Sequence, residues 1–124
     1  MCIRDRTGRP VSLFTLGTMR ALGSVDQMHA VLQAAVLAGI NHLETAPAYG
    51  PAEEFLGQAL RREGRKPDGG WVITSKLLPG LSLSEGKHQL LKILERLSCR
   101  QLDNLAIHGP VSYTHLTLPT NSRV

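Results

Sequence analysis

The chain has 124 residues, a formal net charge of +4 at pH 7, and 42% hydrophobic and 19% charged residues. This length allows one domain at most, or part of a larger one. No apolar run approaches the ~20 residues that a membrane-spanning helix needs, and the weak positive charge does not indicate nucleic-acid binding. We therefore expect neither a membrane nor a nucleic acid as a partner.

The two ends of the chain are related at the level of DNA. One choice of codons for residues 1–5, ATG TGT ATA AGA GAC, has a reverse complement that encodes Val-Ser-Tyr-Thr-His, the sequence of residues 111–115. A DNA linker joined in inverted orientation to both ends of a fragment produces this relation, and the stretch resembles the transposon-end adapter of sequencing libraries. We interpret residues 1–6 and 111–124 as adapter-derived segments that take no part in the fold, and residues 7–110 as the natural domain.

Leaving out the two terminal segments changes the charge and the cysteine count. The formal charge falls to +2, because Arg4, Arg6, Arg123 and Asp5 lie in them, and Cys99 is the only cysteine that remains. A single thiol forms no disulfide framework and indicates a reducing compartment. We expect the protein to reside in the cytoplasm.

Strand-like and helix-like segments alternate along residues 7–110. Residues 11–18 form a short apolar run that predicts the first strand. Apolar residues then recur at helical spacing until Gly39, a typical C-terminal stop, and this helix begins at a capping box made by Ser24 and Gln27. Residues 40–46 predict the second strand.

Pro51 opens the second helix at a favoured first position. The predicted apolar face of this helix consists of Phe55, Leu56, Ala59 and Leu60. A turn cluster at residues 66–70 separates the helix from residues 71–77, which are rich in strand-forming residues and predict the third strand.

A second capping box, made by Ser82 and Glu85, begins the third helix. The predicted apolar side of this helix consists of Leu90, Leu91, Leu94 and Leu97. Residues 102–108 predict the fourth strand and end the pattern.

This order predicts a parallel β/α architecture of about four strands and three helices, with right-handed crossovers. Both an open doubly wound sheet and the first half of an eight-stranded barrel fit the pattern. No G-x-G-x-x-G follows the first strand and no G-x-x-x-x-G-K-[ST] occurs in the sequence. Their absence makes a nucleotide-binding open sheet the weaker interpretation.

Ionisable side chains lie where three of the predicted strands end. Glu44 ends the second strand and Tyr49 lies in the loop after it, while Lys76 and His108 lie at the ends of the third and fourth strands. Each residue alone is more often a surface charge or a structural group. In β/α barrels, however, the C-terminal strand ends form the active-site face. We therefore expect the four side chains to converge on one rim.

These residue types suggest proton transfer to a carbonyl oxygen. A tyrosine phenol has an ordinary pKa of ~10, and a lysine ammonium beside it lowers that pKa by favouring the phenolate. A carboxylate such as Glu44 would keep the lysine charged and oriented, and a neutral imidazole can bind the same carbonyl oxygen. The other histidines and Cys99 lack zinc-ligand spacing, so we expect no metal.

Several of these stretches resemble the aldo-keto reductase family. Residues 39–60, GINHLETAPAYGPAEEFLGQAL, resemble its signature D-T-A-x-x-Y-G-x-x-E-x-x-L-G. WVITSKL resembles the third strand of the family with its catalytic lysine, LDNLAIHGP resembles the fourth strand with its histidine, and LGTMR resembles the end of the first strand. The resemblance covers nearly all of residues 7–110 in the family's order.

The resemblance implies the N-terminal half of a (β/α)8 barrel, from an enzyme that reduces small aldehydes or ketones with NADPH. Matched residue by residue, Tyr49 would be the general acid, Lys76 would lower the pKa of the phenol, and His108 would orient the carbonyl. Glu44 fills the position usually held by aspartate, as a catalytic and cofactor-binding residue. The other residues placed near the nicotinamide by the resemblance are Gly17, Thr18 and Met19.

The sequence departs from the family pattern in two ways. Glu44 is one methylene longer than aspartate, so a salt bridge to Lys76 remains feasible with a shifted geometry. The resemblance also stops after the fourth strand, and it implies that most cofactor contacts belong to later strands. We expect an incomplete fragment that is inactive alone and whose open sheet edges allow self-association.

Two other functions fit the same residues. One is a non-catalytic binding or regulatory subunit, because the potassium-channel β subunits resemble this family. The other is a β/α-barrel lyase or isomerase in which Lys76 forms a Schiff base, which requires a lysine desolvated among apolar groups.

Overall fold

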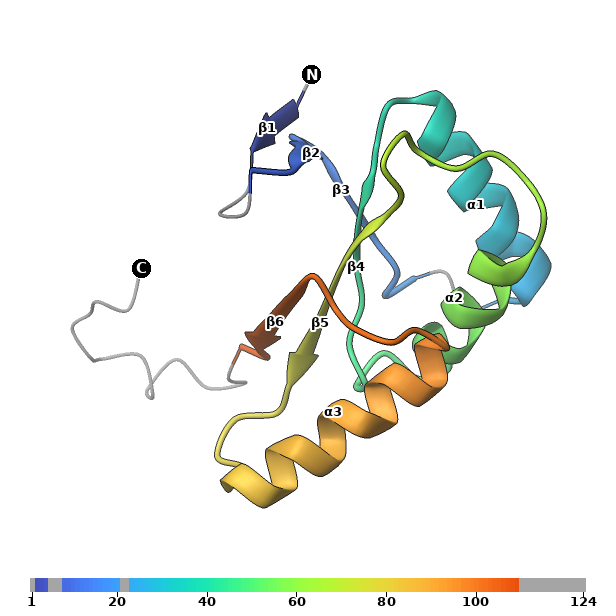
Figure 1. The fold of residues 1–124 in the computed structure, drawn as a ribbon. Helices are drawn as coiled ribbons and strands as arrows, with labels where there is room; N and C mark the ends of the chain where they lie inside the picture. Colours follow the sequence, from blue (N-terminus) through green and yellow to red (C-terminus); the bar gives the residue numbers. More distant parts are fainter. Residues whose placement is uncertain (1, 5–7, 21–22, 110–124) are drawn as a thin grey trace.

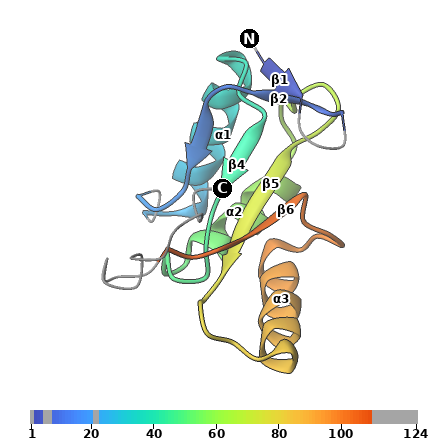
Figure 2. The same ribbon diagram turned by 90° about the vertical axis from the view of Figure 1, so that its left-hand side faces the viewer.

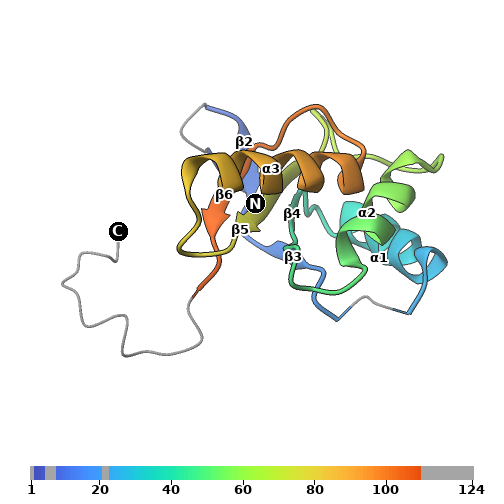
Figure 3. The same cartoon turned by 90° about the horizontal axis from the view of Figure 1, so that it is seen from below.

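The computed structural model describes residues 2–4, 8–20 and 23–109. A sheet of parallel strands carries its helices on one face, as Figures 1, 2 and 3 show. The elements in chain order are β1 (Cys2–Arg4), β2 (Pro10–Ser12), β3 (Thr15–Gly17), α1 (Val25–Leu37), β4 (His42–Glu44), α2 (Ala52–Arg61), β5 (Val72–Leu77), α3 (Leu83–Leu97) and β6 (Asn104–Ile107). No helix among the described residues is long and apolar enough to span a membrane.

The main sheet has the strand order β3-β4-β5-β6, and all of its neighbouring strands are parallel. One helix connects each strand to the next, so consecutive strands are also neighbours in space. This arrangement confirms the predicted parallel β/α architecture of four strands and three helices. It also places the C-terminal ends of all four strands along one edge, where the candidate site lies.

The first predicted strand, residues 11–18, is two strands in the structure. β2 ends at Ser12, and β3 begins at Thr15 after an exposed bend at Leu13 and Phe14. The Ser12 hydroxyl donates to the carbonyl oxygen of Phe14 at 2.6 Å, which stabilises the bend. Only β3 joins the parallel sheet, and the single-strand prediction is wrong for this reason.

β2 pairs instead with β1 in a separate antiparallel ribbon, with Ile3 opposite Val11. β1 falls within residues 1–6, which we expected to take no part in the fold. The expectation is wrong for the backbone of residues 2–4, while their origin as adapter sequence stays a prediction. Residues 111–124, the second segment of this kind, lie outside the described residues.

The capping signals act at both predicted helix starts, but not identically. In α3 the Ser82 hydroxyl accepts from the backbone of Glu85 and the Glu85 carboxylate accepts from the backbone of Ser82, which completes the box. In α1 the Ser24 hydroxyl accepts from the backbone of Gln27 at 3.0 Å. The Gln27 side chain, however, reaches back to the N–H of Gly23 at 3.1 Å.

The hydrophobic core lies between the helices and the sheet. Its buried members are Met28, Leu32, Leu43, Leu56, Ala59, Ile73, Ile93 and Leu97. The apolar side predicted for α3 is wrong at Leu91, which is 64% exposed, whereas Ile93 is fully buried. The two residues lie about 200° apart around the helix axis, so only one of them can face the core.

The two outer strands of the main sheet present open edges in the described part of the chain. No described strand pairs with the outer side of β3 or β6, and large apolar side chains are exposed near them, including Phe14, Leu105 and Ile107. Unpaired strand edges with apolar side chains favour pairing with another chain. We expect dimers or larger assemblies in sedimentation velocity at micromolar concentration. A monodisperse monomer that unfolds cooperatively would contradict this expectation.

Candidate active site

The four ionisable residues predicted at strand ends lie at the same edge of the sheet. Glu44 is the last residue of β4 and pairs with Gly17, the last residue of β3. Lys76 is near the end of β5, and the backbone N–H of His108, just after β6, donates to Leu77 at 2.7 Å. Since side chains alternate along a strand, Glu44 points away from the core that its neighbour Leu43 enters.

Three of these side chains are hydrogen-bonded to one another. The Lys76 ammonium donates to the Tyr49 hydroxyl oxygen at 2.6 Å and forms an ion pair with Oε1 of Glu44. The Tyr49 hydroxyl donates to the same Oε1 at 2.9 Å. The extra methylene of Glu44 therefore does not prevent the expected salt bridge, and the carboxylate also reaches the phenol directly.

His108 completes the group by packing against the tyrosine ring. The two rings meet edge to face, with their centroids 5.8 Å apart and their planes at 75°. Its Nδ1 is buried and has no hydrogen-bond partner among the residues that the structure describes. Among the described residues His29 Nδ1 and Thr45 Oγ1 are likewise buried without a partner, so this feature is not specific to the rim.

The surroundings of Lys76 determine its charge. Burial lowers the pKa of the ammonium, but hydrogen bonds and charge interactions with Glu44 and Tyr49 raise it, and the net effect is a raised pKa. Lys76 is therefore a cation at neutral pH. A lysine that forms a Schiff base needs a lowered pKa, so this finding argues against the lyase or isomerase interpretation.

The raised pKa of Lys76 predicts that part of the stability depends on pH. Because the folded pKa lies above the ordinary value of 10.5, the contribution is fully present below that value and is lost as pH rises through the folded pKa. We expect the midpoint of thermal unfolding to fall at strongly alkaline pH, and to fall less in Lys76→Met. Equal alkaline slopes in the two proteins would contradict the prediction.

The residues predicted near the nicotinamide lie beside Glu44, but they differ in how far they are exposed. The backbone N–H and the hydroxyl of Thr18 both donate to the carbonyl oxygen of Glu44 at 3.1 Å, and Thr18 is fully buried. Thr18 thus holds β3 against β4. Gly17 and Met19 are exposed at the same rim, so of the three they are the ones able to contact a bound molecule.

A row of polar side chains lies on the same face of the sheet as the site, nearer to the N-terminal ends of the strands. The sequence pattern did not lead us to expect it. His42 contacts the hydroxyls of Thr15 at 3.0 Å and Thr74 at 2.7 Å, and Asn104 donates to Thr74 at 3.2 Å. Burial lowers the pKa of His42, against the opposing charges of Asp103 and Glu44. The alternation of residues 40–46 was the signal that could have found it, because it places His42 and Glu44 on one face.

Two residues of the signature stretch, Glu53 and Gly57, also have structural surroundings that the sequence did not reveal. Glu53 is 1% exposed and forms an ion pair with Arg96 of α3. Gly57 lies where α2 meets α3, and a Cβ atom added to it would lie 2.3 Å from the carbonyl oxygen of Arg96. Among the described residues no group of three or more histidine, cysteine, aspartate or glutamate side chains could hold a metal ion.

Solved structures similar to this chain are aldo-keto reductases. A Pseudomonas aeruginosa protein assigned to these enzymes is 31% identical, with a TM-score of 0.69 over 84% of this chain and 44% of its own. A thermostable aldo-keto reductase in complex with the inhibitor epalrestat is 28% identical, with a TM-score of 0.72 over 87% of this chain and 42% of its own. The aldose reductase from Schistosoma japonicum is 26% identical, with a TM-score of 0.66 over 89% and 37%.

The chain spans less than half the length of each of these structures, and its strands and helices match the N-terminal part of their (β/α)8 barrel. A comparison with curated proteins found no match. The sequence model of the Aldo/keto reductase family matches residues 14–120. The chain therefore belongs to the aldo/keto reductase family.

Proposed function

We propose that the protein containing this segment in a full-length barrel is an oxidoreductase that reduces aldehydes or ketones to alcohols with NADPH. The observation that carries the proposal is the Tyr49 hydroxyl held by the Lys76 ammonium at 2.6 Å, at the rim where the His108 ring also lies. A phenol with a neighbouring cation is suited to donating a proton to a carbonyl oxygen.

Each of these residues has a distinct role in the proposed reaction. Tyr49 donates its proton to the substrate oxygen, and the phenolate that remains is stabilised by the adjacent Lys76 charge. His108 binds the same oxygen and orients the carbonyl, which requires a nitrogen not already used within the protein. The His108 ring is only partly buried and lies against the Tyr49 ring at this rim.

The residues at the rim also fit a cofactor. NADPH, when bound, supplies the hydride that the carbonyl carbon accepts. Gly17 and Met19 are exposed beside Glu44, and we propose that they line the part of the site nearest to the nicotinamide. Thr18, which lies between them in the sequence, holds this segment against β4 through its two hydrogen bonds to Glu44.

A steady-state assay on a full-length barrel tests this function. We expect NADPH-dependent loss of cofactor absorbance with an activated aromatic aldehyde, and a larger KM with NADH than with NADPH. Binding of NADPH without reduction of any aldehyde or ketone would favour a regulatory subunit, and equal use of the two cofactors would contradict the proposed cofactor preference.

Glu44 provides a prediction of its own, because its carboxylate accepts a hydrogen bond from the Tyr49 hydroxyl, the group that must donate its proton to the substrate. A carbonyl oxygen has to replace Glu44 as the acceptor when substrate binds. Glu44→Asp shortens the side chain and retains the charge beside Lys76, so we expect kcat within about tenfold of the unmodified enzyme, a difference of ~1.4 kcal/mol. A loss of more than a hundredfold would show that the site depends on the longer side chain.

A further inference from the structure

A single buried carboxylate ties the start of α2 to two other elements. Glu53 is the second residue of α2, and its side chain is almost fully buried. One oxygen, Oε2, accepts from the hydroxyl of Ser75 in β5 at 2.7 Å. The other, Oε1, accepts from Nε of Arg96 in α3 at 2.7 Å. Both oxygens therefore have a partner, and each partner belongs to a different element.

These contacts lie directly behind the candidate active site. Ser75 precedes Lys76 in β5, and because side chains alternate along the strand, Ser75 points toward the helices while Lys76 points to the opposite face. Tyr49 is connected to the start of α2 by a backbone hydrogen bond, since its carbonyl oxygen accepts from Ala52 at 3.2 Å. The contact between Glu53 and Ser75 thus joins the segment that carries Tyr49 to the strand that carries Lys76.

The packing around this carboxylate leaves little room for α2 to shift. At Gly57, one helical turn after Glu53, the backbones of α2 and α3 are so close that even a Cβ atom would meet the Arg96 carbonyl oxygen at 2.3 Å. Ionised groups are costly to bury, and apolar residues of similar volume often stabilise a protein as well or better. Stability alone is therefore a weak reason for a buried ion pair here, whereas directional contacts to two elements suit a positioning role.

We propose that Glu53 is a positioning residue for the active site, which holds the start of α2 against β5 and so keeps the Tyr49 hydroxyl in contact with the Lys76 ammonium. The effect of this positioning on catalysis rests on the function proposed above. The proposal itself concerns the geometry of the resting site, so it can be tested without substrate or cofactor.

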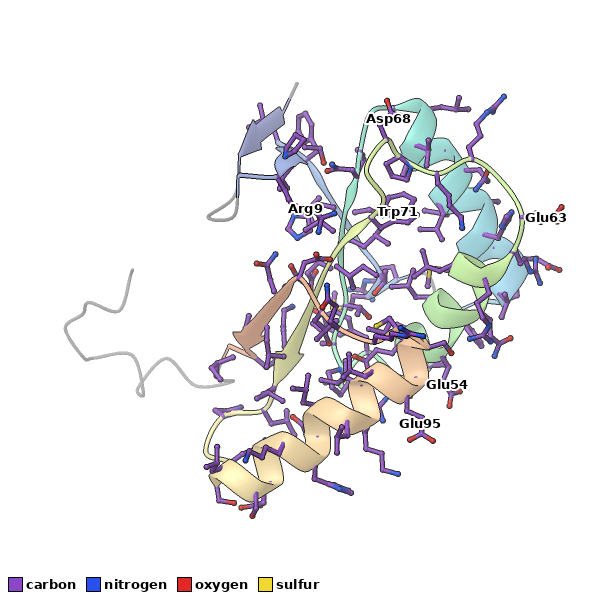
Figure 4. The ribbon with its side chains drawn as sticks, in the orientation of Figure 1. Arg9, Glu54, Glu63, Asp68, Trp71 and Glu95 are labelled. Atoms are coloured by element: carbon purple, nitrogen blue, oxygen red, sulfur yellow. The ribbon has the colours of Figure 1, made fainter. Side chains whose placement is uncertain are left out.

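The test is the pKa of Lys76 in the 124-residue chain, measured by NMR titration of ¹³C-labelled lysine side chains. The chain has only four lysines, and Lys76→Met identifies the signal. Burial lowers the pKa of this ammonium, and contacts with Glu44 and Tyr49 more than offset that effect. Moving the Tyr49 hydroxyl away, while Lys76 stays in place on β5, should therefore lower the pKa. We compare Glu53→Gln and Ser75→Ala with Glu54→Gln, which removes the same charge from the next residue. Glu54 is exposed, and Figure 4 shows it on the outer surface near Glu95.

The three variants separate positioning from a simple effect of charge. If Glu53 positions the site, Glu53→Gln and the uncharged change Ser75→Ala both lower the pKa of Lys76 by more than the error of the titration. Glu54→Gln leaves it unchanged within error. A shift in Glu53→Gln without one in Ser75→Ala would show a charge effect only and would overturn the proposal, as would no shift in either variant.

Folding of the variants is checked by circular dichroism. If Glu53→Gln does not fold, the milder Ser75→Ala decides the outcome by the same criterion. Failure of this test leaves the proposed reaction standing, because the titration involves neither aldehyde nor NADPH. Conversely, an inactive full-length enzyme whose Lys76 responds as expected would refute the reaction and leave the positioning role intact.

Discussion

Replacing Tyr49 with phenylalanine in a full-length barrel should lower kcat for aldehyde reduction by about 100- to 10,000-fold, the usual contribution of a general acid. This loss corresponds to about 3–5 kcal/mol of transition-state stabilisation. The change removes the hydroxyl that donates to Glu44 and accepts from Lys76, but it preserves the ring that packs against His108. Steady-state kinetics with NADPH and an activated aldehyde measure the effect.

Lys76→Met is the companion variant, because it retains the hydroxyl and removes the cation beside it. We expect a large loss of kcat here too, with a smaller change in the dissociation constant of NADPH in both variants. Thermal unfolding of each variant serves as the control for misfolding. If Tyr49→Phe keeps full activity, the assigned proton donor is wrong, and a binding role becomes the better explanation of the site.

Truncating Ile93 to alanine should destabilise the fold by about 2–5 kcal/mol, because a fully buried side chain is lost and leaves a cavity. Ile93 packs in the core between α3 and the sheet. Leu91→Ala is the matched control on the same helix, where the side chain is 64% exposed. Substitutions of exposed side chains usually change the free energy of unfolding by less than about 0.5 kcal/mol.

Denaturant unfolding of the two variants, followed by circular dichroism, measures both changes. A larger loss in Leu91→Ala than in Ile93→Ala would mean that α3 is rotated about its axis relative to the described orientation. It would also restore the apolar face that the sequence pattern suggested for this helix.

The sequence predicted the elements well wherever a local signal determines the structure. The capping residues Ser24 and Ser82 and the stop at Gly39 act between neighbours in the chain. Ile40, for example, donates back to Ala35 just after that glycine, at 2.9 Å. The convergence of Tyr49, Lys76 and Glu44 was also predictable, because parallel strands bring their C-terminal ends to one edge.

The features that the sequence did not reveal depend on partners far away in the sequence or on the direction in which a side chain points. Glu53 reads as an ordinary first-turn carboxylate of α2, and its partners Ser75 and Arg96 lie 22 and 43 residues away. The bend that separates β2 from β3 is stabilised by the hydroxyl of Ser12, one of several small polar residues in a mostly apolar run. Leu91 is a leucine like Leu90 and Leu94, and only the orientation of α3 about its axis in the fold shows that it faces outward.

The most direct test of the account is the transfer of deuterium from labelled cofactor to product. A full-length barrel containing this segment is incubated with an activated aldehyde and NADPH deuterated at its transferable position, and the alcohol is analysed by mass spectrometry. We predict one deuterium on the carbinol carbon of the alcohol, formed at a rate that falls by about 100-fold or more in Tyr49→Phe. Absence of labelled alcohol, or equal labelling rates in the two proteins, would contradict the proposed reaction.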